Sequence, residues 1–103
     1  MKWDNDDYSD WRVVEHGGWC DKENIRLKFP ERAGVYVFAD IDLQVKYIGS
    51  AGAGRLREEA ISAIRRGKGR GASKANWLAT NSEENARSLE YELINKYNPS
   101  NNY

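Results

Sequence analysis

The sequence predicts a small α+β domain with a three-stranded antiparallel sheet and flanking helices, in the order β-β-α-β-α. Residues 34–39 and 44–49 are rich in β-branched and aromatic residues, and a short polar turn separates them, which is typical of a hairpin. Apolar residues recur at helical spacing in two later stretches. At 103 residues the chain has the size of one domain.

The first helix is expected to begin at Arg55 and to end at Gly67, because glycine commonly terminates helices. Its apolar face would consist of Leu56, Ala60, Ala63 and Ile64. A third strand is predicted over Asn76–Thr80, with a helical turn as the alternative.

The last helix is expected to follow a capping box of Asn81 and Glu84. It would run to about Tyr97, because Asn98-Pro99 cannot continue it. Its apolar stripe is predicted to contain Ala86, Leu89, Leu93, Ile94 and Tyr97.

Charge is unevenly distributed along a chain of zero net charge. Residues 1–24 carry seven acids and three bases, whereas residues 55–74 carry seven bases and two acids, and such a basic segment can attract phosphate. We expect residues 1–28 to be an acidic, aromatic extension that packs on a domain spanning 29–103. In a second interpretation the extension is an acidic flap that occupies the basic segment.

Cysteine content and hydropathy limit the remaining classes. Cys20 is the only cysteine, so an intrachain disulfide is excluded, and with the single His16 it cannot build a zinc cluster. No apolar stretch approaches the roughly 20 residues of a membrane helix. The expected compartment is the cytoplasm, with no membrane partner.

Glu90 is the residue least expected from packing alone. At helical spacing its neighbours are mostly apolar, and a carboxylate is rarely placed there without a partner or a metal. A salt bridge to an arginine such as Arg55 is the structural alternative. Tyr36 and Tyr47 lie on paired strands, and Arg55 opens a helix, where a bound anion would relieve its conflict with the helix dipole. Ordinary core aromatics and a solvated arginine are the corresponding alternatives.

Together these residue types suit phosphodiester hydrolysis. Arginine clamps phosphate, glutamate binds Mg²⁺, and tyrosine hydroxyls orient or transfer protons. The reaction needs positive charge on the phosphoryl oxygens and an activated water.

Gly34-Val35-Tyr36, followed after ten residues by Tyr47-Ile48-Gly49, resembles the signature of the GIY-YIG nuclease superfamily. Arg55-Leu56-Arg57 is similar to the start of the family's first helix, and LEYELINKYNPSNNY is similar to the end of its bacterial excision-repair members. The resemblance covers about residues 30–103. It implies a GIY-YIG-like fold in which Gly34 and Gly49 belong to the structural motif.

The resemblance implies an endonuclease with one divalent ion, Mg²⁺ or Mn²⁺, held by Glu90. Tyr47 or Tyr36 would help to activate the water. Arg55 would stabilise the phosphate by residue identity, or Arg57 by the more usual spacing. The implied partner is DNA, with RNA left open, and a targeting protein would serve a chain without a separate DNA-binding domain. The residues expected to contact nucleic acid are Arg65, Arg66, Lys68, Arg70, Lys74 and Asn102. The alternative function is a catalytically silent module, on the same fold, that binds nucleic acid or a protein.

Overall fold

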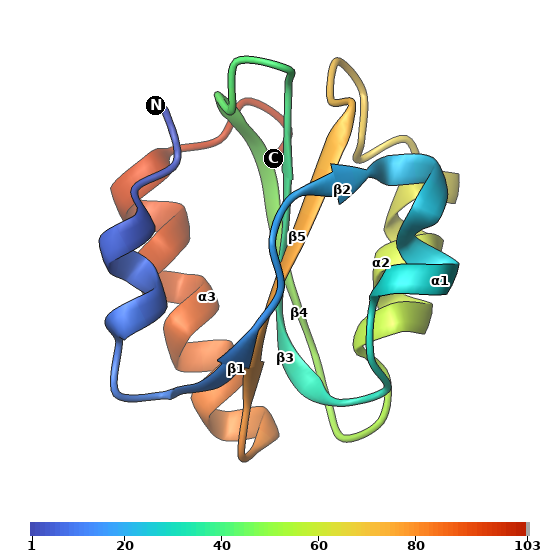
Figure 1. Cartoon of the computed structure of the whole chain (residues 1–103). Coiled ribbons are helices and arrows are strands. Elements are labelled where there is room, and N and C mark those ends of the chain that lie inside the picture. The colour runs from blue at the N-terminus through green and yellow to red at the C-terminus, as the bar shows by residue number, and fades with distance from the viewer. Residues whose placement is uncertain (103) are drawn as a thin grey trace.

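The computed structural model describes residues 1–102 (Figure 1). The strands are β1 Val13–His16, β2 Cys20–Asp21, β3 Ala33–Ala39, β4 Val45–Ala51 and β5 Lys74–Thr80. The helices are the short 3₁₀ helices η1 Asn5–Ser9 and η2 Lys22–Asn24 and the α-helices α1 Ile25–Lys28, α2 Leu56–Arg65 and α3 Glu83–Tyr97. None of the helices within residues 1–102 combines the length and the apolar character needed to cross a membrane.

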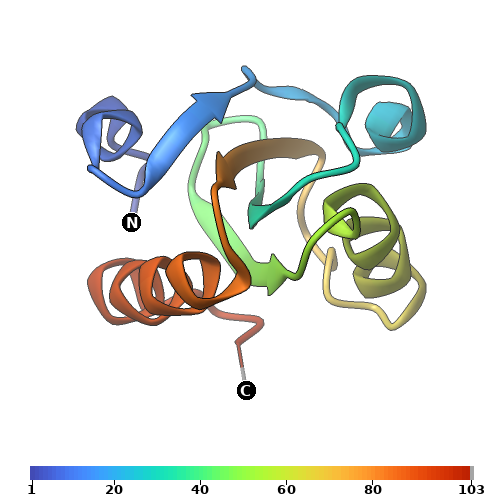
Figure 2. The same cartoon turned by 90° about the horizontal axis from the view of Figure 1, so that it is seen from below.

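The predicted fold class is confirmed: an antiparallel sheet lies between helices on both faces (Figures 1 and 2). The spatial order is β1–β5–β3–β4, and β2 pairs with the opposite end of β5 from β1. The predicted third strand is β5, so its helical alternative is wrong. The sheet is wider than the three strands expected, because residues 13–21 add β1 and β2 to the outer side of β5.

The hairpin of β3 and β4 forms because its sequence favours extended backbone and its turn is well bonded. Asp40 Oδ1 accepts hydrogen bonds from the backbone N–H groups of Asp42 and Gln44, both at 2.9 Å. Leu43 adopts a left-handed φ of 63°, which lets the chain reverse within few residues. The register pairs Tyr36 with Gly49 and places β4 at the edge of the sheet.

Two apolar cores lie on opposite faces of the sheet. Side chains alternate along β3, so Tyr36 and Phe38 pack toward α1 and α2, whereas Val35 and Val37 pack toward α3. Every residue of β3 is buried, as expected for a central strand covered on both faces. The stripe predicted for the last helix faces the second core: Ala86, Leu89, Leu93 and Tyr97 are buried, and Ile94 is half-buried.

The last helix begins one residue later than predicted. Its N-cap is Ser82, whose hydroxyl accepts from the backbone N–H of Asn85 at 3.0 Å, so Asn81 is not the cap. Ser82 has the extended backbone that a cap requires, and β5 already runs to Thr80. The helix ends at Tyr97, as predicted, and its C-cap Asn98 adopts a left-handed conformation before Pro99.

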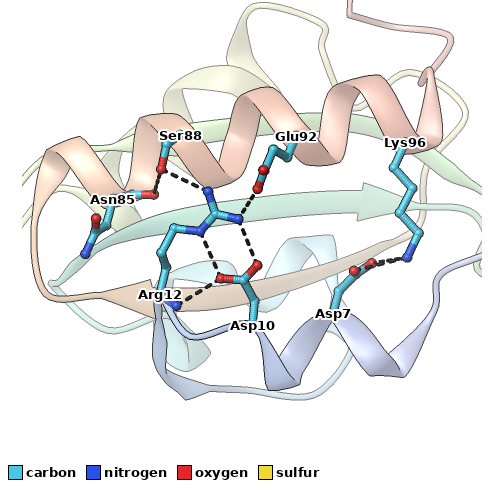
Figure 3. Close-up of polar contacts among 7 residues, drawn as sticks. All are labelled: Asp7, Asp10, Arg12, Asn85, Ser88, Glu92 and Lys96. Carbon is cyan, nitrogen blue, oxygen red and sulfur yellow. Dashed lines mark hydrogen bonds and ion pairs between the residues drawn. The ribbon is translucent and has the colours of Figure 1, made fainter.

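The N-terminal segment packs along α3, on the other side of the molecule from α2 (Figures 1 and 2). Trp3 is buried and stacks on Tyr97 with ring centroids 5.4 Å apart. Arg12 lies between Asp10 and the α3 residues Ser88 and Glu92 and hydrogen-bonds to all three, and Lys96 contacts Asp7 (Figure 3).

These contacts contradict the acidic-flap interpretation. Asp4, Asp7 and Asp10 are engaged by Lys96, Tyr97 and Arg12 and not by the basic stretch that follows α2. Asp21 is the exception, because it pairs with Lys74 at 2.7 Å.

Candidate active site at the edge of the sheet

Tyr36 and Tyr47 lie on the same face of the sheet, on adjacent strands. Their ring centroids are 6.1 Å apart, and Phe38 packs against both rings. A Cβ atom built at Gly49 would lie 2.3 Å from both Cζ and the hydroxyl oxygen of Tyr36. The space left free by Gly49 is therefore filled by the hydroxyl end of Tyr36, which reaches the edge strand β4.

The two tyrosines differ in environment. Tyr36 is 2% exposed, and this burial raises the pKa of its hydroxyl above the ordinary value; Tyr47 raises it further, and so do the charges of Glu59 and Glu90, while Arg66 acts in the opposite direction. Tyr36 thus stays protonated further into the alkaline range than an ordinary tyrosine. Tyr47 is only half-buried, and the ammonium of Lys68 lies over its ring, 5.9 Å from the centroid.

Glu90 approaches β4 from α3, on the opposite face of the sheet. Its Oε1 accepts a hydrogen bond from the hydroxyl of Ser50 at 2.7 Å. Side chains alternate along β4, so Ser50 points toward α3 while Tyr47 and Gly49 point toward α2. The tyrosines and Glu90 thus reach the same edge strand from its two faces.

Glu90 has no ion-pair partner within the described chain, so the predicted alternative of a salt bridge to Arg55 is wrong. Arg55 instead pairs with Glu59 at 2.9 Å and with Glu58 at 3.4 Å, both one turn further along its own helix. Glu90 is left as a half-buried carboxylate. Within residues 1–102, the one hydrogen bond of its side chain comes from the neutral hydroxyl of Ser50.

A surface cleft of about 390 Å³ lies where β4 runs into α2. Its walls include Ser50, Gly52, Arg55, Glu59, Glu83 and Arg87. Arg87 pairs with Glu83 at 2.7 Å. Arg55 at the start of α2 and Arg87 on α3 each bring a guanidinium group to this cleft, where Glu59 and Glu83 pair with them.

Arg57 lies elsewhere. Its Nε donates to the backbone carbonyl of Phe29 at 2.8 Å, and its guanidinium pairs with Glu31 at 2.9 Å. These contacts tie α2 to the segment before β3. Of the two candidate arginines, Arg55 is the one that lines the cleft.

The six residues expected to contact nucleic acid do not form one surface. Arg66, Lys68 and Arg70 line a common depression of about 250 Å³ together with Ser100 and Asn101. The loop that holds them is fixed by Asn101, whose side-chain amide donates to the carbonyls of Lys68 and Arg70.

The other three residues lie apart from this depression. Arg65 lines a separate pocket beside α1, and Lys74 is paired with Asp21. Asn102 faces the backbone of β4: its amide accepts from the N–H of Ile48 at 2.9 Å and donates to the carbonyl of Ile48 at 2.8 Å. Asn102 thus fastens the C-terminal segment to the edge strand.

Gly34 permits a close approach of strands. A Cβ atom there would lie 2.3 Å from the carbonyl oxygen of Leu78 on β5.

Ser50, Glu59 and Arg87 are site residues that the sequence analysis did not identify. The sequence analysis ends the second strand at residue 49, whereas β4 continues through Ser50 and Ala51. Extending the alternation of the strand by two residues would have placed Ser50 on the same face as Ile48. The spacing of Arg55 and Glu59 was an available signal for their ion pair.

The donor set around Glu90 fits one hard divalent cation. Within residues 1–102 no group of three or more His, Cys, Asp or Glu side chains could hold a metal ion. Mg²⁺ commonly binds through one or two carboxylates and keeps several waters, so a half-buried carboxylate beside an open cleft is a suitable ligand.

The fold is that of a nuclease-type domain, and it carries paired tyrosines on adjacent strands, an arginine at a helix start and a glutamate on the last helix. The chain is 31% identical to the magnesium-bound GIY-YIG N-terminal endonuclease domain of UvrC from Thermotoga maritima, with a TM-score of 0.67 over 80% of this chain and 94% of that one. It therefore belongs to the GIY-YIG nuclease superfamily.

Point mutants of the same domain, one with tyrosine replaced by phenylalanine and one with asparagine replaced by alanine, are both 30% identical to this chain at a TM-score of 0.67. Both are described as bound to a catalytic divalent cation. Neither the protein-family models nor the curated proteins contain a match to this sequence.

Proposed function

We propose that this protein is a metal-dependent endonuclease that hydrolyses phosphodiester bonds in DNA. The observation that carries the proposal is the position of Glu90, a half-buried carboxylate without a cationic partner in residues 1–102, at the strand that also carries Tyr47. The divalent cation described in the UvrC domains supports the same assignment.

Glu90 would hold the ion, which would be Mg²⁺ or Mn²⁺. When bound, such an ion supplies positive charge to the phosphoryl oxygens and acidifies water. The contribution of the chain is to fix the carboxylate and to leave the cleft open beside it.

Tyr47 would contact the attacking water, because it is the more accessible tyrosine of the pair. Tyr36 would remain protonated and donate a hydrogen bond from its hydroxyl, since burial raises its pKa. Tyr36 thus orients its neighbours and is not an anionic base.

Arg55 would stabilise the phosphate as negative charge develops in the transition state. Its pairs with Glu58 and Glu59 are exposed to solvent, and exposed ion pairs contribute little to stability, so a phosphate can compete with them. Arg66, Lys68 and Arg70 would contact the DNA backbone through phosphates, without reading base sequence.

The test is nicking of supercoiled plasmid with Mg²⁺ or Mn²⁺. We expect Glu90→Gln to abolish nicking, while Glu84→Gln, a matched change at an exposed position in the first turn of the same helix, retains it. EDTA should stop the wild-type reaction. If the wild type binds DNA but leaves plasmid and branched DNA uncut, the protein is a silent binding module on this fold.

A further inference from the structure

The hydrogen bond between Ser50 and Glu90 joins the two parts of the proposed site. Ser50 immediately follows Tyr47-Ile48-Gly49 on β4, and Glu90 lies on α3, forty residues later. The donor–acceptor distance of 2.7 Å is typical of a hydroxyl bonded to a carboxylate. Ser50 also lines the cleft that contains Arg55.

We propose that Ser50 is a positioning residue for the divalent-ion site: its hydroxyl fixes the Glu90 carboxylate for ion binding. This inference rests on the proposed function. Ser50 bonds to Oε1, and Oε2 has no hydrogen-bond or ion-pair partner in residues 1–102. One carboxylate oxygen is thus held by the protein, and the other remains available to a cation.

Glu90 needs such a partner because of its side-chain freedom. A glutamate has three rotatable side-chain bonds, and holding it in one conformation for an ion costs entropy. A single donor to Oε1 reduces this cost before the ion arrives. It also partly compensates the half-buried carboxylate for lost hydration while no ion is bound.

A hydroxyl suits this position better than a charged donor. Lysine or arginine at residue 50 would neutralise Glu90 and compete with the cation for the same carboxylate. Serine fixes the carboxylate and leaves its negative charge intact. The neighbouring guanidinium of Arg55 is held by Glu58 and Glu59 and does not pair with Glu90.

The competing explanation is that Ser50 only connects α3 to the sheet. The two explanations differ in what the loss of the hydroxyl changes. If Ser50 positions Glu90, loss of the hydroxyl lowers the affinity for the ion and leaves the fold unchanged. Mutation of a residue that hydrogen-bonds to a metal ligand commonly lowers metal affinity or activity about 10–100-fold. A connecting role lowers the free energy of unfolding and leaves the affinity for the ion as it was.

The experiment is a titration of the purified full chain with Mn²⁺ alone, followed by electron paramagnetic resonance or calorimetry. Ser50→Thr and Ser50→Val form a matched pair: both are β-branched and suited to a strand, but only threonine retains the hydroxyl. We expect Ser50→Val to raise the Kd for Mn²⁺ about 10-fold or more, and we expect the Kd of Ser50→Thr to stay near that of the wild type. Ser50→Ala serves as a second variant without the hydroxyl, and urea unfolding checks that each variant folds.

Ser88→Ala is the control on α3, because Ser88 bonds to Arg12 on the other flank of the helix. It should leave the Kd for Mn²⁺ unchanged. In addition, the nicking rate of Ser50→Val should rise toward the wild-type rate as Mn²⁺ is raised to saturation, which a general loosening of α3 would not produce.

If Ser50→Thr, Ser50→Val and Ser50→Ala all bind Mn²⁺ as tightly as the wild type while Glu90→Gln does not bind it, the role of Ser50 is overturned and the proposed function is left intact. A wild type that binds no Mn²⁺ would overturn both.

Discussion

Gly49 and Tyr36 form a single unit at the residue scale. The ring of Tyr36 is buried between Phe38, Tyr47 and the bare backbone of Gly49, so its hydroxyl has one place to lie. In a packed interior a side chain cannot be displaced without moving its neighbours. Gly49, from the motif on β4, thus determines the position of the hydroxyl of Tyr36, from the motif on β3.

Gly49→Ala should therefore displace Tyr36. The added Cβ would lie 2.3 Å from the Tyr36 ring, well inside contact distance. We expect a loss of about 1–3 kcal/mol in the free energy of unfolding, the usual cost of overpacking, together with loss of nicking. Urea unfolding and the plasmid assay measure both. Gly18→Ala, at a position with nothing within 4 Å, is the control and should change neither.

Arg55 and Arg57 should separate catalysis from stability. Arg55→Gln is expected to lower the nicking rate at least tenfold with little change in stability, because its pairs within α2 are exposed. Arg57→Gln should lower the free energy of unfolding by about 1 kcal/mol, since it loses a hydrogen bond to the carbonyl of Phe29. A reversed pattern in nicking and urea unfolding would assign the phosphate to Arg57.

At the scale of elements, the N-terminal segment and α3 stabilise one another. Arg12 is 7% exposed and hydrogen-bonds to Asp10, Ser88 and Glu92, so it closes the flank of α3 that faces away from Glu90. Trp3 and Tyr97 extend the contact to the end of the helix. The helix that carries Glu90 is thus held along the sheet and along one side.

Arg12→Met should lower the free energy of unfolding by about 2 kcal/mol, because several hydrogen bonds to charged groups are lost and Asp10 is left without its partner. Arg87→Met is the matched control: that guanidinium is 72% exposed and pairs only within α3, so a few tenths of a kcal/mol are expected. If urea unfolding gives similar losses in the free energy of unfolding for both variants, the hydrogen bonds of Arg12 stabilise the protein no more than an exposed ion pair does.

Several elements could be predicted from sequence because their signals are local. The composition of residues 34–39 and 44–49 predicted the hairpin, and the 3.6-residue period predicted the buried stripe of α3. The N-cap was misplaced because Asn81 and Ser82 are both good caps, and the end of β5 decides between them. The pairing of β1 with β5 joins Val13 to Thr80, and no local pattern specifies a contact so distant in sequence.

The site divides in the same way. The motif and its surroundings name Tyr36, Tyr47 and Glu90 as candidates, with Arg55 or Arg57 as the arginine, and their catalytic roles stay predictions. The bond from Ser50 to Glu90 depends on how α3 crosses β4, and the partners of the basic residues depend on which element faces each of them. Three-dimensional packing determines those contacts.

At the scale of the whole molecule, each of the two cores contains a tyrosine whose pKa is raised on folding. Burial is the main cause that raises the pKa of Tyr36 and of Tyr97, and a hydrogen bond to Asp7 adds to it for Tyr97. A group whose pKa is raised on folding stabilises the protein at low pH. That stability is fully present below the unfolded pKa of about 10 and is lost as the pH rises through the folded value.

The protein should therefore lose stability progressively above about pH 10, and both cores should contribute. Tyr97→Phe is expected to be less stable at neutral pH, because its bonds to Asp4 and Asp7 are lost, yet less sensitive to alkali than the wild type. Urea unfolding at pH 8 and pH 10.5 makes the comparison. If the wild type and Tyr97→Phe lose the same free energy of unfolding between pH 8 and pH 10.5, Tyr97 does not contribute to the loss of stability in alkali.

The C-terminal segment has a consequence for association between molecules. An edge strand presents unpaired N–H and C=O groups and can recruit a strand from another chain. Asn101 donates its N–H to Lys46, and the amide of Asn102 satisfies both backbone groups of Ile48, much as a neighbouring strand would. This C-terminal segment blocks strand addition along the first half of β4, which discourages fibril-like growth, and its contacts do not extend to the Ser50 end of the same edge.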